Sequence, residues 1–161
     1  MKGGFMYLVA LLDVHSRYIV SWSLSNTMET GFCIDALKKG LVYAHPEIIN
    51  NEQVCQFTSN DWVDYLNEWG IKISMTGKGR CLDNIYIERF WRSFKREKFY
   101  LNEYNTVKDL RYAIEEYVKF YNQRRWHQSF NYETPAEVYF KQAREACGYV
   151  DASFGQAMDN A

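Results

Sequence analysis

The sequence lacks the features that would mark a membrane, secreted or multidomain protein. No apolar run reaches the about 18 residues that a membrane-spanning helix needs, and Met1-Lys2-Gly3-Gly4 is too short for the charged start of a secretory signal. The two prolines and nine glycines form no linker that would divide the 161 residues. We therefore expect a single cytoplasmic domain built around one hydrophobic core.

Closely spaced cysteines are absent as well. The chain has four cysteines, at positions 33, 55, 81 and 147, and no two of them are near each other in the sequence. This spacing argues against a zinc ribbon and against a small disulfide-stabilised scaffold. We expect all four to be free thiols.

An overall excess of positive charge is also missing, since the formal net charge is −1. Any binding to nucleic acid must therefore come from a local asymmetry of charge. Residues 72–98 have such an asymmetry, with eight basic and three acidic side chains and hence a local net charge of +5. The basic residues are Lys72, Lys78, Arg80, Arg89, Arg92, Lys95, Arg96 and Lys98, and the acidic ones are Asp83, Glu88 and Glu97.

The apolar pattern of the first residues predicts two paired strands and a helix. Phe5–Leu12 is a short apolar run and Arg17–Leu24 alternates in polarity, which together indicate a β-hairpin. Apolar residues then recur at helical spacing from Thr27, interpreted as the N-cap, to Ala44.

The remainder is predicted to contain two short strands and four helices. The strands are expected at residues 47–50 and 71–75. The helix starts are indicated by Ser59, by Asp83 or Asn84, by Thr106 with Asp109, and by Thr134 before Pro135. The resulting order, β-β-α-β-α-β-α-α-α, is typical of an α/β layered domain.

Glu88 is the first candidate for chemistry. Helical spacing puts Arg92 and Lys95 one and two turns after Glu88, on the polar side of the predicted helix. A carboxylate there can hold a divalent metal while the basic residues bind phosphate. The alternative is an ordinary ion pair between Glu88 and Arg92 on a solvated face.

The residues around Glu88 resemble the signature of a large family of insertion-sequence transposases. The resemblance is carried by residues 74–84, SMTGKGRCLDN, and by residues 88–97, ERFWRSFKRE. Three further blocks agree with it: Tyr7-Leu8-Val9-Ala10 with Leu12-Asp13 and Ser16-Arg17, Tyr121-Asn122 with Arg125 and His127, and Thr134-Pro135-Ala136-Glu137. Together the blocks span about residues 2–140.

The resemblance implies a fold and a chemistry. The expected fold is an RNase H-like mixed sheet flanked by helices over residues 1–146, followed by a loose tail at residues 147–161. In the family's DDE chemistry, Mg²⁺ or Mn²⁺ held by three carboxylates activates water, and then a 3′ hydroxyl, for attack on DNA. Glu88 matches the last carboxylate of the three. DNA, as element ends and target, is the expected partner, together with a second copy of the chain.

The sequence departs from the family at the second carboxylate. Glu52 occupies the place of an aspartate within residues 50–59, and Val54 replaces a glycine. The extra methylene moves the carboxylate by about 1 Å, and a displacement of that size costs on the order of a hundredfold in rate. From composition alone, Glu52 is an ordinary loop carboxylate.

The first carboxylate has no match in this sequence. In the family it lies on a strand before the block that matches Lys2-Gly3-Gly4-Phe5, so we expect the sheet to lack its first, central strand. Asp13 matches a different family position and is interpreted as a turn residue or a partner of Arg17. We therefore expect strand cleavage and transfer to be impaired in this chain.

DNA binding is assigned to basic residues in two of the family blocks. The predicted contacts are Lys78, Arg80, Arg92, Lys95, Arg125 and His127. The alternative for His127 is a polar cluster at the C-terminal end of a helix. His15 and His45 have no partners at metal-ligand spacing and are interpreted as surface or turn residues.

Two functional hypotheses remain open, together with a weaker third. The first is a transposase core that performs metal-dependent strand transfer, and the second is a DNA-binding or regulatory remnant that has lost catalysis. The third is an RNase H-like nuclease that acts on another nucleic acid, which fold analogy alone does not exclude.

A shared metal site requires Glu52 and Glu88 to approach each other in the folded chain. Their Cα atoms are expected to lie within about 12 Å, the distance over which two carboxylates can bind a shared metal site. A crystal structure of the chain soaked in Mn²⁺ measures this distance directly. Glu52 and Glu88 on opposite faces of the molecule would rule out the assignment.

Overall fold

The structure is a computed structural model that describes residues 5–51, 55–75 and 85–147. In chain order its elements are β1 (Tyr7–Leu12), β2 (Ile19–Ser25), α1 (Gly31–Leu41), β3 (Ile48–Asn51), α2 (Asn60–Glu68), β4 (Lys72–Met75), α3 (Ile85–Glu97), η1 (Phe99–Leu101), α4 (Val107–Gln123), η2 (Gln128–Phe130) and α5 (Pro135–Cys147). The predicted order of strands and helices is confirmed, with two short 3-10 turns added. The expected tail lies outside the described residues, apart from the last residue of α5.

Strands β1 and β2 form the predicted antiparallel hairpin, with a bulge between Leu11 and Leu12. The turn is closed by Asp13, whose Oδ2 accepts hydrogen bonds from the backbone N–H and the hydroxyl of Ser16 at 2.8 and 2.5 Å. Asp13 is therefore the turn residue that the sequence indicates. Arg17, at a left-handed φ of 64°, instead lays its guanidinium over the ring of Tyr86, 3.0 Å from the ring centroid.

The hairpin separates two apolar clusters, because successive side chains of a strand point to opposite faces. Leu8, Ala10 and Leu12 pack in the cluster formed mainly with α3 and α4. Val9 and Leu11 pack in the other cluster, formed mainly with α1 and α2. The single core expected from length alone is thus divided into two by the sheet.

Helix α1 packs unusually close to the hairpin at Gly40. A Cβ atom at this position would lie 3.1 Å from Leu11 Cδ1 and 3.1 Å from Ser21 Oγ. The same approach lets Ser21 Oγ donate a 2.7 Å hydrogen bond to the carbonyl of Ala36. Glycine and serine at these two positions therefore bring the helix against the sheet.

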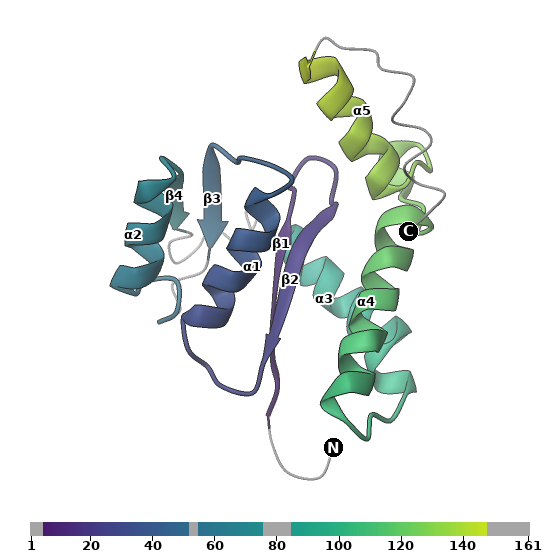
Figure 1. Cartoon of the computed structure of the whole chain (residues 1–161). Coiled ribbons are helices and arrows are strands. Elements are labelled where there is room, and N and C mark those ends of the chain that lie inside the picture. Colours follow the sequence, from purple (N-terminus) through teal and green to yellow (C-terminus); the bar gives the residue numbers. More distant parts are fainter. Residues whose placement is uncertain (1–4, 52–54, 76–84, 148–161) are drawn as a thin grey trace.

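Strands β3 and β4 form a second, parallel pair beside the hairpin, in the order β4-β3-β1-β2 across the molecule (Figure 1). Among the described residues, no strand lies between β3 and β1, and the two pairs are separate two-stranded sheets. The absence of the first, central strand from the sheet stays a prediction.

Most helix starts follow the predicted caps. Ser59 Oγ accepts from the backbone N–H of Trp62 at 3.4 Å, and Thr106 and Asp109 form a reciprocal capping box. The predicted cap at Thr27 is wrong, since α1 begins at Gly31 after Thr30. The backbone N–H of Thr27 is bound by Ser25 Oγ in a turn, which extends the loop before the helix.

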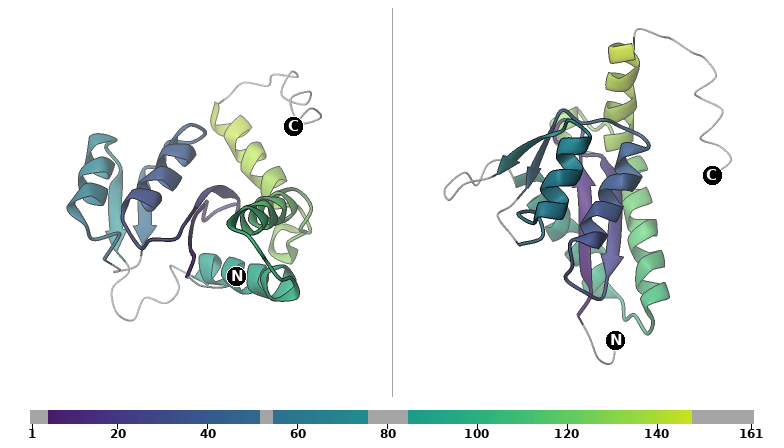
Figure 2. Two further views of the ribbon diagram at one scale, coloured as in Figure 1. Left: turned by 60° about the horizontal axis from the view of Figure 1, so that its bottom comes forward. Right: turned by 60° about the vertical axis from the view of Figure 1, so that its left-hand side comes forward.

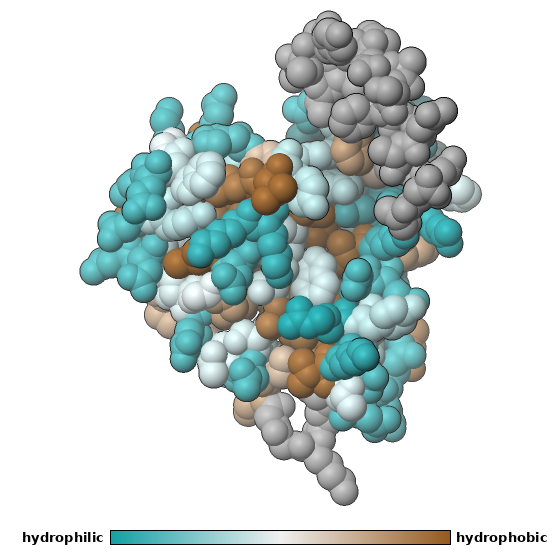
Figure 3. Space-filling view, in the orientation of Figure 1, coloured by the Kyte–Doolittle hydropathy of each residue, from teal (hydrophilic) through white to brown (hydrophobic). Residues whose placement is uncertain are grey.

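Polar side chains cover most of the face seen in Figure 3, and apolar side chains form separate patches on it. No helix in the described ranges is long and apolar enough to cross a membrane. The described thiols, buried Cys33 and exposed Cys55, are both free, as predicted.

Helix α4 lies along the hairpin (Figure 2), and its buried side chain Asn122 binds the backbone of β2. Its Oδ1 accepts from the backbone N–H of Ile19 at 2.9 Å, and its Nδ2 donates to the carbonyl of Ile19 at 3.0 Å. The amide thereby binds both backbone groups of Ile19 on the edge of β2 where no described strand pairs.

The Asn122→Ala variant is expected to lower the free energy of unfolding by about 1–3 kcal/mol, because it leaves both backbone groups of Ile19 buried without partners. Urea denaturation of the two chains measures the difference. The exposed neighbour provides the control, since Gln123→Ala should change stability by less than about 0.5 kcal/mol. Equal effects of the two variants would contradict the role assigned to the amide.

Candidate functional site

Helix α3 carries the candidate site on an amphipathic scaffold. Phe90 and Phe94, one turn apart, are buried in the apolar cluster shared with α4. Glu88, Arg92 and Lys95 follow one another at helical spacing and are all exposed. The apolar side anchors the helix, and the opposite side presents one carboxylate followed by two cations.

Glu88 is available for a ligand in this arrangement. It lies in the first turn of α3 and makes no ion pair or hydrogen bond with any residue in the described ranges. The ordinary ion pair between Glu88 and Arg92, which the spacing left open, is therefore not formed. An unpaired carboxylate oxygen is the ligand type that Mg²⁺ prefers.

The other predicted ligand and two of the predicted DNA contacts, Glu52, Lys78 and Arg80, lie outside the described residues. The proximity of Glu52 and Glu88 thus stays a prediction. Within the described ranges no group of three or more histidine, cysteine, aspartate or glutamate side chains could hold a metal ion. Glu88 has the chemistry of a metal ligand, but no such group forms around it among the described residues.

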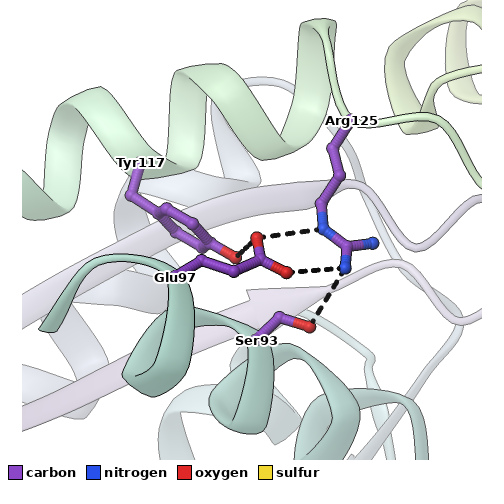
Figure 4. A network of polar contacts seen from close by, with 4 residues as sticks. All are labelled: Ser93, Glu97, Tyr117 and Arg125. Carbon is purple, nitrogen blue, oxygen red and sulfur yellow. Dashed lines mark hydrogen bonds and ion pairs between the residues drawn. The ribbon is translucent and has the colours of Figure 1, made fainter. Parts of the chain in front are cut away.

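Arg125 takes part in a network of polar contacts between α3 and the end of α4 (Figure 4). Its Nε and one terminal nitrogen donate to the two carboxylate oxygens of Glu97 at 3.2 and 2.8 Å. Ser93 Oγ lies 3.4 Å from the same guanidinium, and the hydroxyl of Tyr117 donates to Glu97 at 2.8 Å. This bidentate pair fixes the geometry of α3 against α4.

The network also sets the protonation of Glu97 and Tyr117. Burial acts to raise the pKa of Glu97, but the hydrogen bonds from Arg125 and Tyr117 outweigh it, and the pKa is lowered overall. Burial together with the Glu97 carboxylate raises the pKa of Tyr117 far above its ordinary value. The pair is therefore charged and the phenol neutral at neutral pH.

His127 lies in an aromatic environment near this network. Its ring packs edge-on against Tyr121, at a centroid distance of 5.3 Å, and stacks on Phe130 at 5.7 Å. Burial, followed by the charges of Arg125 and Arg17, lowers the pKa of His127 to about 4. The imidazole is thus neutral at pH 7, and the geometry favours a packing role. Its predicted contact with DNA, like that of Arg125, stays a prediction.

Sequence reasoning did not single out Glu97, Tyr117 or Asn122 as positioning residues. Each stands inside a family block or an apolar stripe, but its partner lies 20 or more residues away. Helical spacing does not predict contacts of that kind. Among these contacts, only the block of Tyr121-Asn122 with Arg125 indicated from the sequence that the end of α4 has a defined structure.

The comparisons with known proteins account for these blocks. Matches to the family described as Integrase core domain cover residues 1–81 and residues 69–135. The chain belongs to the integrase core domain family. The predicted family and the predicted type of fold are both confirmed.

Curated relatives of this integrase core domain include proteins of bacterial insertion sequences. The InsK protein of insertion sequence element IS150 from Escherichia coli is 34% identical over 141 residues, which are 85% of this chain and 50% of the relative. The transposase for insertion sequence element IS904 from Lactococcus lactis is 31% identical, over 84% of this chain and 55% of the relative. The chain thus spans about half the length of these relatives.

Solved structures similar to this integrase core domain are retroviral integrase catalytic cores. The catalytic core domain of BIV integrase has a TM-score of 0.71 and 13% identity, over 86% of this chain and 88% of that one. The HTLV-2 core solved as a dimer in complex with magnesium has a TM-score of 0.67 and 21% identity, over 85% and 86% of the two chains. The fold is therefore RNase H-like.

The lowered pKa of His127 makes stability depend on pH. The unfolded chain binds a proton near pH 6.5 and the folded chain only near pH 4, so the free energy of unfolding falls as pH decreases from 6.5 to 4, with a slope of at most about 1.4 kcal/mol per pH unit. Urea denaturation at several pH values measures the slope.

The His127→Phe variant keeps the aromatic packing and removes the titrating group, so its stability should depend less on pH in this window. The exposed His15 provides the control, and His15→Gln should leave the slope unchanged. An unchanged slope in His127→Phe would contradict the burial of a neutral imidazole.

Proposed function

We propose that this integrase core domain acts in DNA transposition or integration and binds DNA through the exposed face of α3. The observation that carries the proposal is the position of Glu88, whose carboxylate has no partner among the described residues, on the same side of the helix as Arg92 and Lys95. Phosphate oxygens and a divalent cation bind together on such a surface, because the cation neutralises carboxylate and phosphate at once. The similarity to insertion-sequence transposases supports this reading.

The proposed cofactor is Mg²⁺ or Mn²⁺, held by Glu88 and Glu52. The exposed carboxylate of Glu88 fits such an ion, and the similar HTLV-2 core was solved in complex with magnesium. When bound, the ion would polarise the scissile phosphate and lower the pKa of an attacking hydroxyl.

The side chains of this chain would bind and orient the DNA. Arg92 and Lys95 would hold phosphates next to Glu88, with Lys78 and Arg80 extending the basic surface. The pair of Arg125 with Glu97, and the pair of Lys98 with Glu116 at 3.1 Å, would keep α3 fixed against α4 while DNA is bound. Strand transfer needs catalytic groups held within about 0.5 Å of their productive positions, and these two contacts would help to hold them there.

Catalysis by residues 1–161 is proposed to be slow. Glu52 carries one methylene more than the aspartate of the family, and β3, which leads to Glu52, is paired on only one side among the described strands. A loosely held carboxylate loses much of the advantage of orientation. A DNA-binding role without efficient catalysis is therefore the second candidate function.

The proposed partners are DNA and further copies of the chain. Similar HTLV-2 cores were solved in dimeric and trimeric forms, and a similar viral integrase was solved as an intasome. An assembly would bring two DNA ends together, which strand transfer requires.

The combined variant K78A/R80A/R92A/K95A is expected to weaken DNA binding and to reduce its salt dependence. Each phosphate contact contributes about −0.9 to the slope of log K against log salt, so the loss of four contacts reduces the slope by about 3 to 4. Fluorescence anisotropy on a labelled duplex between 50 and 200 mM salt measures both quantities.

The control removes four positive charges elsewhere on the surface, in the combined variant K38A/K39A/K108A/K141A. It changes the net charge equally but should retain most of the slope. Equal loss of binding in the two variants would show that overall charge, and not the face of α3, binds DNA.

Strand transfer by the chain as it stands is expected to be at least about a hundredfold slower than by a chain extended by a family-like first strand and carrying Glu52→Asp. Gel assays on DNA that bears the element's ends, with Mg²⁺ or Mn²⁺, compare the rates. Glu88→Gln in the extended chain should abolish transfer. Comparable rates for the original and extended chains would refute the proposed impairment.

A further inference from the structure

Arg17, in the turn between β1 and β2, is a half-buried cation without a carboxylate partner among the described residues. Neither ion pair of these residues includes it. Asp13, the nearest acidic residue in the sequence, accepts hydrogen bonds from Ser16 and not from the guanidinium of Arg17. Burial acts to lower the pKa of Arg17 and the contact with Tyr86 to raise it, and the pKa is lowered overall. A cation in such a place is stabilised by an anion that binds to it.

The guanidinium of Arg17 contacts two aromatic rings that come from other elements. Its Cζ lies 3.0 Å from the ring centroid of Tyr86, in the first turn of α3, and 5.5 Å from that of Phe130, in η2. A stacked ring contacts the face of a guanidinium, whereas the N–H donors lie in its plane. The stack on Tyr86 therefore fixes the orientation of the group and leaves donors in its plane for an anion that binds through two oxygens.

The backbone of Arg17 is strained while it holds this side chain. Its φ of 64° lies in the left-handed region, which glycine adopts without steric cost. Residues other than glycine keep such a conformation only where the surrounding contacts hold them, and they cluster at ligand sites. The turn thus has an arginine where glycine would be less strained, which points to a use for the side chain.

A second cation, Arg89, lies beside Arg17 on one flank of α3. Tyr86, Arg89 and Ser93 form this flank, because residues three or four apart in a helix are neighbours. Ser93 contacts Arg125, so the flank faces the residues just after α4 (Figure 4). The charge of Arg89 acts on Arg17, which indicates that the two cations are close. Arg89 is exposed, and no described carboxylate pairs with it.

We propose that Arg17 and Arg89 bind a phosphate of the DNA backbone, in a second contact region that adjoins the face of Glu88. The inference rests on the proposed function and extends its DNA surface. Arginine donors form paired hydrogen bonds with phosphate oxygens, and an anion between two cations removes their mutual repulsion. Glu88 and Arg89 are consecutive in α3 and project about 100° apart. DNA at the candidate site therefore contacts two neighbouring sides of the first turns of α3.

Arg17→Gly removes the side chain and suits the left-handed backbone, so it tests the contact without straining the turn. It should weaken binding of a fluorescein-labelled duplex about eightfold at 0.1 M salt and reduce the slope of log K against log salt by about 0.9, the effect of one phosphate contact. Arg89→Ala should have the same effect. Arg17→Lys keeps the charge and should keep the slope. Fluorescence anisotropy with residues 1–161 measures both quantities.

Arg111→Ala provides the matched control, because Arg111 also lies over an aromatic ring, that of Trp22 at 5.9 Å, near the start of α4. It removes one positive charge but should leave the slope unchanged. An unchanged slope in Arg89→Ala or in folded Arg17→Gly, or an equal loss in Arg111→Ala, would overturn the proposal. Displacement of the duplex by inorganic phosphate at constant ionic strength, in the original chain but not in Arg17→Gly, would overturn it in favour of a free phosphate ion.

The combined variant K78A/R80A/R92A/K95A separates this inference from the proposed function. A reduced slope in that variant together with an unchanged slope in Arg17→Gly would overturn the second contact region and leave the proposed face of α3 in place. Absence of salt-dependent binding by the original chain would overturn the proposed function, and this inference with it.

Discussion

The packing of α4 on the hairpin is the contact on which the C-terminal half of the molecule depends. It combines the buried hydrogen bonds of Asn122 to both backbone groups of Ile19 with an apolar cluster shared by β2, α3 and α4. Helix α4 in turn supplies Tyr117, and the residues just after it supply Arg125, which together bind Glu97 at the end of α3. Helix α3, which carries Glu88 in its first turn, is thus held against α4 by these partly exposed polar contacts and by the apolar cluster around Phe90 and Phe94.

The basic residues near the site are divided between two tasks. Arg125 and Lys98 are paired with carboxylates and hold the helices together. Arg92 and Lys95 have no ion pair among the described residues and remain exposed, beside the unpaired carboxylate of Glu88. A chain with a net charge of −1 can therefore still present a positively charged surface, because Glu97 and Glu116 pair with Arg125 and Lys98 and not with Arg92 or Lys95.

The two separate strand pairs bear directly on this site. β3 ends at Asn51, immediately before Glu52, and a cavity beside β3 is lined in part by Tyr86 and Ile87 from the turn before Glu88. The cavity therefore lies between the described end of β3 and the first turn of α3, which carries Glu88.

The sequence by itself determined the family, the order of the elements and most of their boundaries. Apolar periodicity, the Ser59 cap and the Thr106–Asp109 capping box are local signals that depend on residues a few positions apart. The resemblance located Glu88, and the structure places it exposed on α3 as expected. The Thr27 cap failed: Ser25 Oγ binds the backbone N–H and the hydroxyl of Thr27 in a turn, and the helix begins only at Gly31.

Only the tertiary structure decided which polar residues face inward and where the sheet is interrupted. Arg125 is held by Glu97 and His127 lies among aromatic rings, which their place in a block does not predict, while their expected contact with DNA stays a prediction. Strands β1 and β3 line one cavity although they are more than 30 residues apart in the sequence. Contacts of this kind depend on packing between distant segments, which neither helical nor strand periodicity encodes.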